Sequence, residues 1–173
     1  NKKGIQISKD WIVNALTTTD SFSLKLEIDS LYENLEIYNF KEINRELIFN
    51  CIQSSFGKLS FDVDVVSLIK QDKNKFIEQS KKTISSIEKA VTFLFNKVFV
   101  IDSKLLPTNW HLIFVTEFYN ILEKPTLNQL EDLKKWFWFT AYSNYFTVYS
   151  PSKRAKAFQQ FRDYLIGNEA DMI

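Results

Sequence analysis

The scarcity of glycine and proline is the feature that most constrains the fold of this chain. Only three residues of each type occur among 173, whereas ordinary proteins carry about 7% Gly and about 5% Pro. Because these two residues most often interrupt helices and form tight turns, the sequence predicts long elements with few turns. It shows no alternation of strand and helix patterns, so we predict an all-α fold. We expect one bundle of about eight helices, forming a single domain over residues 1–173.

Apolar residues recur at helical spacing in eight stretches of the chain. These stretches cover approximately residues 9–17, 23–38, 45–55, 60–69, 75–98, 109–122, 126–139 and 151–165. Start and stop signals mark several of their boundaries. The signals are Ser8 and Asn44 as caps, Ser60 or Asp62 as the cap of the fourth helix, Asn39 and Gly57 as left-handed stops, the capping box Thr126-x-x-Gln129, and Ser150 followed by Pro151.

Two segments do not follow this pattern clearly. The polar run at 70–74 predicts a solvated linker and is the best candidate for a boundary within the domain. The run Val-Phe-Val-Ile at 98–101 fits either a fraying helix end or a short strand. Periodicity alone does not separate these two interpretations, so a short irregular or strand-like segment near 98–106 stays open.

Charge and cysteine content exclude several classes of protein. The 22 basic and 21 acidic residues nearly cancel, which excludes a strongly basic nucleic-acid wrapper and an acidic tail. A single cysteine excludes an intrachain disulfide framework and a Cys-rich zinc site, and it fits a reducing, cytoplasmic compartment. No apolar stretch reaches the roughly 20 residues of a membrane span, so we expect no membrane partner. The chain starts without Met or a signal peptide, and we interpret it as a piece of a longer protein.

The chain contains one histidine, His111, and one cysteine, Cys51. Both residue types are common in catalytic sites. His111 lies in an apolar helix without a carboxylate on its own face, so we expect a structural residue held by a local hydrogen bond. Cys51 lies on an apolar helical face, which favours an inert buried thiol. We therefore predict no catalytic residue, no metal site and no cofactor. The alternative is an enzyme in which distant carboxylates converge on His111.

Basic residues gather in two places. Lys153, Arg154 and Lys156 open the last helix, with Arg162 further along, and they follow an aromatic stretch over 136–149. Cations beside aromatic rings can bind phosphates and stack bases, so these four residues are candidates for nucleic-acid contact. Lysines also line the longest helix, where acidic residues dilute them and a solvated face is the simpler interpretation. These are Lys73, Lys75, Lys81, Lys82, Lys89 and Lys97.

Two separated motifs resemble a known family. Residues 1–8 read NKKGIQIS, and residues 106–107 read LP before an apolar helix that is followed by LKKWFWFTA at 133–141. They resemble the N-x-x-G-x-x-L-S segment, the L-P helix and the W-F/Y-W-x-S-A motif of bacterial proteins with a ParB/sulfiredoxin-like amino-terminal domain, related to GmrSD-type restriction enzymes. The matching residues are Asn1, Gly4, Ser8, Trp136, Trp138 and Ala141. Phe139 and Tyr145 stand where relatives often carry Arg.

The resemblance implies a function for the parent protein and a role for this piece. Such proteins act in phage defence, joining a nucleotide-using or nuclease-like domain with a D-G-Q-Q-R signature to a helical part. This chain has neither that signature nor an H-N-H constellation. The resemblance therefore implies a non-catalytic helical module that scaffolds or couples the missing ParB-like domain, with DNA contact as an open addition. We expect an exposed apolar surface where that domain would sit, or a homodimer that covers it. The alternative function is a sequence-tolerant nucleic-acid-binding module using the cations of the last and longest helices.

Overall fold

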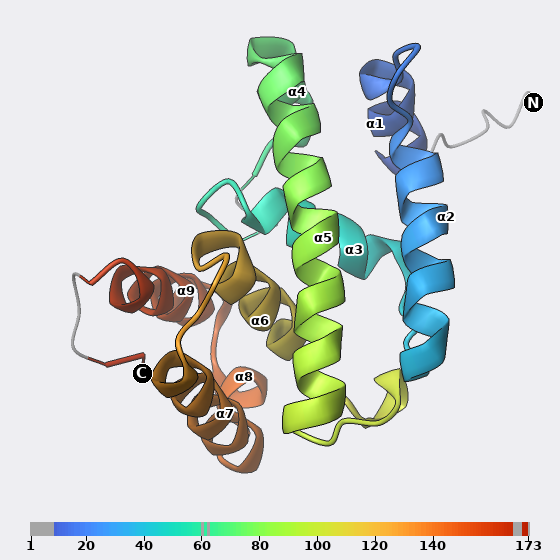
Figure 1. The fold of residues 1–173 in the computed structure, drawn as a ribbon. Coiled ribbons are helices and arrows are strands. Elements are labelled where there is room, and N and C mark those ends of the chain that lie inside the picture. Colours follow the sequence, from blue (N-terminus) through green and yellow to red (C-terminus); the bar gives the residue numbers. More distant parts are fainter. Residues whose placement is uncertain (1–8, 60, 62, 168–170, 173) are drawn as a thin grey trace, which may run out of the picture.

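The structure is a computed structural model, and it describes residues 9–59, 61, 63–167 and 171–172. In this part of the chain the fold is all-α, as predicted, with nine α-helices, two short 3₁₀ helices and no strand (Figure 1). The α-helices are α1 (Lys9–Thr17), α2 (Leu24–Leu35), α3 (Arg45–Ser54), α4 (Val65–Gln71), α5 (Lys73–Lys97), α6 (Asn109–Ile121), α7 (Leu127–Tyr142), α8 (Tyr145–Val148) and α9 (Pro151–Leu165). The 3₁₀ helices are η1 (Glu36–Tyr38) and η3 (Ser103–Leu105).

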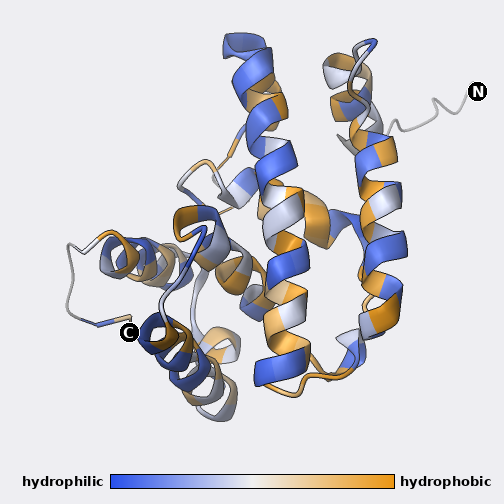
Figure 2. Cartoon of the chain, viewed as in Figure 1, coloured by the Kyte–Doolittle hydropathy of each residue, from blue (hydrophilic) through white to orange (hydrophobic). Residues whose placement is uncertain are grey.

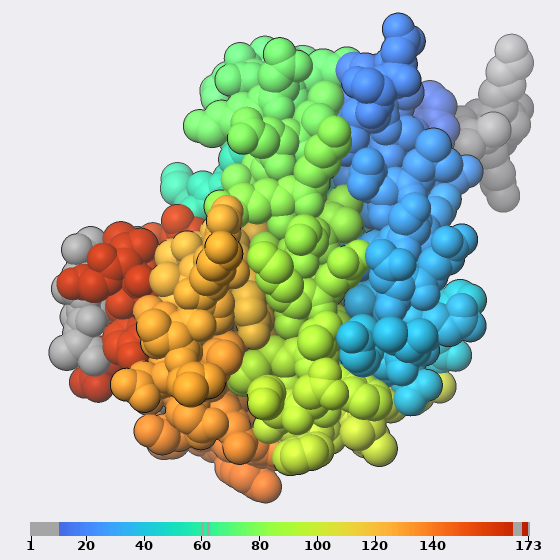
Figure 3. All heavy atoms as spheres, viewed as in Figure 1, coloured from blue at the N-terminus to red at the C-terminus, as the bar shows by residue number. Residues whose placement is uncertain are grey.

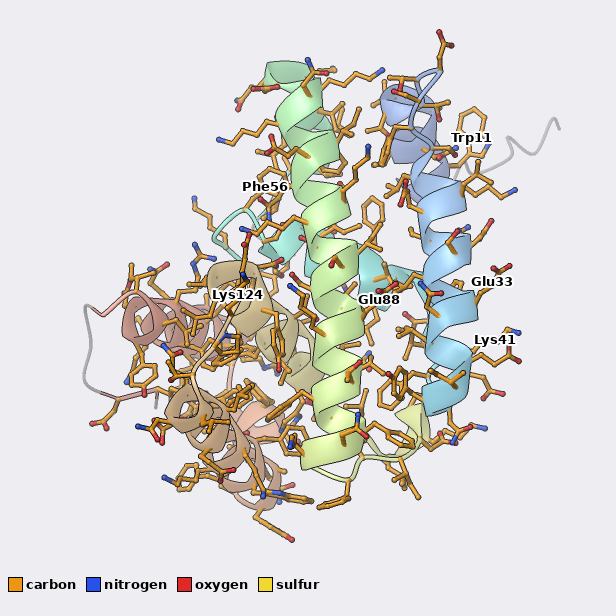
Figure 4. All side chains as sticks on the ribbon, viewed as in Figure 1. Trp11, Glu33, Lys41, Phe56, Glu88 and Lys124 are labelled. Atoms are coloured by element: carbon orange, nitrogen blue, oxygen red, sulfur yellow. The ribbon has the colours of Figure 1, made fainter. Side chains whose placement is uncertain are left out.

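Helix α6 is the centre of the bundle because it is apolar on nearly all sides. Ten of its 13 residues are buried, as expected for a helix without a polar face. It packs against α3, α5 and α9, while α5 also packs against α2 and α4. In the space-filling view α5 runs along the front of the molecule between α2 and the orange segments that include α6 and α7 (Figure 3). Glu88 of α5 points towards α2, where its carboxylate accepts a hydrogen bond from Asn34 at 2.7 Å (Figure 4).

Most start and stop signals act as the sequence predicts. Asn39 ends η1 with a left-handed φ of 59°, and Gly57 follows α3 with a φ of 94°. Thr126 and Gln129 form both hydrogen bonds of a capping box. Ser150 caps α9, and Pro151 occupies its first turn.

The predicted linker at 70–74 is wrong. Asp72 alone separates α4 from α5: its N–H donates to Leu68 O, and its side chain accepts from Lys75 N. Buried Ile69 and Phe76 on either side belong to one hydrophobic cluster that extends from α1 to the C-terminal residues. The hydrophobic core therefore includes residues on both sides of this segment. The cap of α4 is Asp64; positions 60 and 62, which the sequence favoured, lie outside the described residues.

Segment 98–106 is irregular apart from η3, as one of the two alternatives predicted. Residues 98–101 form neither a frayed helix end nor a strand. Val98 and Val100 are buried, whereas Phe99 between them is 73% exposed with a φ of 62°. This left-handed residue reverses the chain at the end of α5, and Figure 2 shows the hydrophobic character of the loop. Asn39 holds the loop through two hydrogen bonds, to Ile101 O and from Ser103 N.

No helix in the described ranges combines the length and the hydrophobicity needed to cross a membrane. Helix α8 was not predicted from the sequence. It is a single turn that follows Asn144, which adopts a left-handed φ of 53°.

Candidate functional site

Two cations at the start of α9 lie over aromatic rings from other elements. Lys153 Nζ is 5.5 Å from the ring centre of Tyr149, and Arg154 Cζ is 5.3 Å from that of Trp110, the second residue of α6. Each of these two rings has a further aromatic neighbour. The ring centroids of Tyr145 and Tyr149 are 4.3 Å apart, and those of Phe61 and Trp110 are 6.3 Å apart. We call these six residues the cation–aromatic cluster: Phe61, Trp110, Tyr145, Tyr149, Lys153 and Arg154.

The cations of this cluster have no acidic partner among the residues that the structure describes. Neither Lys153 nor Arg154 forms an ion pair there. The first turn of α9 contains no acidic residue, and the buried Nε of Arg154 lacks a hydrogen-bond partner. The N-terminus of a helix is electropositive, so cations there are held against the helix dipole. The cluster is therefore a concentrated positive surface next to exposed and half-buried rings.

Tyr145 is held in its neutral form. Burial, with the neighbouring Tyr149 as a lesser cause, raises the pKa of Tyr145 to about 12. A neutral phenol keeps its ring available for cation–π contact and does not oppose the binding of an anion.

Neither of the other two candidate cations lies over a ring of the cluster. Lys156 is exposed on α9. Arg162 pairs instead with Glu117 of α6, whose side chain is 2% exposed. Asn120 donates to the same carboxylate at 3.0 Å, and the guanidinium of Arg162 also lies beside Gly57. The charge of Arg162 is thus compensated in the interior between α3, α6 and α9.

Several lysines of α5 are held by neighbouring elements. Lys73 donates to Thr18 O at 3.3 Å, Lys81 lies 5.2 Å from the ring centre of Phe22, and Lys82 is 3.8 Å from a carboxylate oxygen of Glu123. These contacts agree with a mainly structural and solvated face. Lys75, Lys89 and Lys97 are exposed at spread positions along the helix.

His111 is held by hydroxyl groups. Thr108 Oγ1 lies 3.0 Å from its Nδ1, which is the local contact expected from the sequence, and Thr140 Oγ1 lies 3.3 Å from its Nε2. Phe137 and Phe146 pack against the ring at centroid distances of 4.9 and 5.1 Å. Burial lowers the pKa of His111 to about 4, so the imidazole is neutral at pH 7.

Cys51 is likewise buried, and burial raises the pKa of its thiol to about 12. A thiol that stays protonated is a poor nucleophile and a poor metal ligand. Among the described residues, no group of three or more His, Cys, Asp or Glu side chains is placed to hold a metal ion.

The residues of the family-like motifs are only partly described. Asn1, Gly4 and Ser8 lie outside the described residues. Trp136 is 3% exposed and packs between Phe114 and Phe161, with centroid distances of 5.4 and 4.9 Å. Trp138 is half-buried and stacks on exposed Tyr142 at 5.4 Å. Trp136 therefore anchors the core as expected, whereas Trp138 lies at its edge.

Exposed apolar side chains occur on α1, next to a small groove. Trp11, Ile12 and Leu16 are 61%, 36% and 37% exposed, and Trp11 extends from α1 beside α2 (Figure 4). The groove between α1, α2 and α3 has a volume of about 200 Å³ and is lined in part by Trp11 and Phe49. These side chains form an exposed apolar surface on α1, and Phe99, Ile101 and Leu105 are also exposed in the loop after α5.

Sequence reasoning did not identify Phe61 and Trp110 as members of the cluster, because both are far from residue 154 in the chain. The only available signal was an aromatic residue at the start of an otherwise buried helix, which is common in cores. Comparison of the chain with protein-family models, curated proteins and solved structures finds no match.

Proposed function

We propose that this chain is a non-catalytic helical module that contacts nucleic acid through the cation–aromatic cluster, as part of a restriction or phage-defence protein of the GmrSD-like, ParB-domain type. The observation that carries the proposal is the placement of Lys153 and Arg154 over Tyr149 and Trp110 without an acidic partner among the described residues. Unpaired cations bind phosphates, and neighbouring rings add stacking surface.

The engagement of the buried polar groups supports a scaffold role. His111 is held between two threonines, and Glu117 is held by Arg162 and Asn120. Each of these groups joins different parts of the chain, and burial keeps His111 neutral. Their contacts favour a role in holding the bundle together over a role in chemistry.

The identity of the parent protein rests on the motif resemblance alone. The exposed side chains of Trp11, Ile12 and Leu16 would suit contact with the ParB-like domain that precedes this part in such proteins. The test is the gene itself: a D-G-Q-Q-R-type segment encoded upstream of Asn1 would support the family. A different domain in that position would remove it.

Nucleic-acid contact is tested by titrating labelled single-stranded and duplex oligonucleotides at two salt concentrations. We expect binding that weakens steeply with salt, because phosphate contacts release counterions. The variant Lys153→Gln/Arg154→Gln should make the negative slope of log K against log salt shallower by about 1.4 for a single strand, since each contact contributes roughly 0.7.

The matched control is Lys41→Gln/Lys104→Gln, which removes the same charge at two lysines that pair with Glu36 and Glu42. Figure 4 shows Lys41 beside α2, away from α9. It should keep the affinity and the slope of the parent chain. Absence of binding to every oligonucleotide at low salt would refute the proposal, and so would an equal loss in both variants.

A further inference from the structure

We infer that the cation–aromatic cluster is a site for single-stranded nucleic acid, with unpaired bases stacking on the exposed ring of Phe61 and with phosphates held by Lys153 and Arg154. This inference rests on the proposed function and names the ligand class of the same site. It depends on the exposure of the rings, on the charge around them and on the geometry of α9.

The aromatic side of the cluster offers a surface that a paired base cannot use. Phe61 is 49% exposed, and its ring stands at 82° to that of Trp110, with centroids 6.3 Å apart. Arg154 lies over Trp110, so Phe61 is the most accessible ring of this pair. The bases of a duplex stack on one another and present only their edges in the grooves, whereas unpaired bases can stack on aromatic side chains. An exposed ring beside a cation therefore favours a single strand.

The two cations form two separate units. Lys153 and Arg154 are consecutive in α9 and so point about 100° apart around the helix. Each is consequently placed over a different ring, Tyr149 for Lys153 and Trp110 for Arg154. Helix α9 therefore presents two cation–ring pairs, each of which could contact a phosphate of a single strand.

The position of the cations in α9 also favours an anionic ligand. Positive side chains in the first turns of a helix oppose its dipole, and no acidic residue of that turn offsets them. The free protein therefore holds Lys153 and Arg154 at a cost in stability, which a bound phosphate would relieve. An acidic peptide could satisfy the same cations, so competition by an acidic polymer separates the two classes of ligand.

The first test separates stacking from charge. Binding of a labelled oligothymidylate is measured by fluorescence anisotropy and compared with an abasic oligomer of equal length and charge and with a duplex. We expect the abasic oligomer and the duplex to bind roughly tenfold more weakly than the single strand. Phe61→Ala should lower affinity for the single strand by a similar factor without changing its salt slope. The control Phe99→Ala removes an exposed ring that is not part of the cluster, just after the C-terminal end of α5, and should have no effect.

The second test uses the opposite effects of one substitution on binding and stability. Lys153→Glu should weaken binding more than tenfold. It should also raise the melting temperature of the free chain, whereas the loss of a structural contact would lower that temperature. A lower melting temperature would contradict the argument from the helix dipole.

The possible failures are distinguishable. Equal affinity for single strand, abasic oligomer and duplex would overturn this inference while leaving the proposed function in place. No binding to any of the three would overturn both. Displacement of the single strand by polyglutamate at equal charge concentration would point to an acidic protein partner and would also overturn both.

Discussion

The ion pair between Arg162 and Glu117 gives a quantitative prediction about what holds α9 on the bundle. Glu117 is 2% exposed, and its carboxylate has two partners, Arg162 and Asn120. Replacing Arg162 by Met keeps an apolar side chain but removes the guanidinium, whose Cζ lies 6.0 Å from the ring centre of Phe158. The substitution leaves the buried carboxylate with one neutral donor, Asn120. Breaking a buried pair in this way typically costs about 3–5 kcal/mol. The side chain of Arg162 is 25% exposed, and water can enter where it was, so we expect a loss of about 3 kcal/mol.

A double-mutant cycle separates the pair from its surroundings. Glu117→Leu alone leaves a partly exposed guanidinium that water can solvate, and it should cost about 1–2 kcal/mol. Glu117→Leu/Arg162→Met removes both charges and should lie within about 1 kcal/mol of the parent chain, because hydrophobic replacement of a buried pair is often neutral.

The assay is urea unfolding at pH 7, followed by tryptophan fluorescence and circular dichroism. Free energies of unfolding for the four chains are compared at a common m-value. A loss under about 1 kcal/mol for Arg162→Met, or a double variant as unstable as the sum of the two single variants, would refute the reasoning. Folded Arg162→Met should also retain the affinity of the parent for oligonucleotides, since this charge is used inside the bundle.

Three further predictions concern single residues. Burial lowers the pKa of His111 in the folded chain to about 4, below its ordinary value of about 6.5. Between these two pH values the unfolded chain binds a proton at His111 that the folded chain does not. The free energy of unfolding should therefore fall by about 3 kcal/mol as the pH drops from about 6.5 to about 4. This component should vanish in urea titrations of His111→Gln, and an unchanged pH curve would contradict it. Phe99→Gly should raise the free energy of unfolding by about 1 kcal/mol, because Gly adopts the left-handed φ without strain and the ring is mostly exposed; a decrease would show that the ring makes a stabilising contact. Cys51 should resist iodoacetamide in the native chain and react in urea, as followed by mass spectrometry; rapid native labelling would count against a buried thiol.

Local signals explain which parts of the fold were predictable. The capping box at Thr126 and the left-handed stop at Asn39 depend on residues within a few positions of each other, so the sequence contains the whole interaction. The 70–74 run was misassigned because Lys and Gln favour helices as well as solvated loops. The burial of Ile69 and Phe76 against other helices makes this segment helical. A local sequence pattern does not include those contacts.

The candidate site was predictable only in part for the same reason. Lys153 and Arg154 stood out as a basic run after an aromatic stretch. Trp110 lies more than 40 positions away from them in the chain, and Phe61 more than 90, so only the packed bundle brings these rings to α9. The separation of Arg162 from this group has a similar origin, since its partner Glu117 belongs to α6.

The continuity of the core across Asp72 has a consequence for how the molecule is assembled. Helices α2 and α3 pack on α5, and α3 also packs on α6. The part of the chain before Asp72 and the part after it therefore cover apolar surface of each other. Two peptides divided at this residue would each be left with an open hydrophobic face. They should remain largely unstructured apart and should acquire the native helices only when mixed, in the manner of complementing fragments.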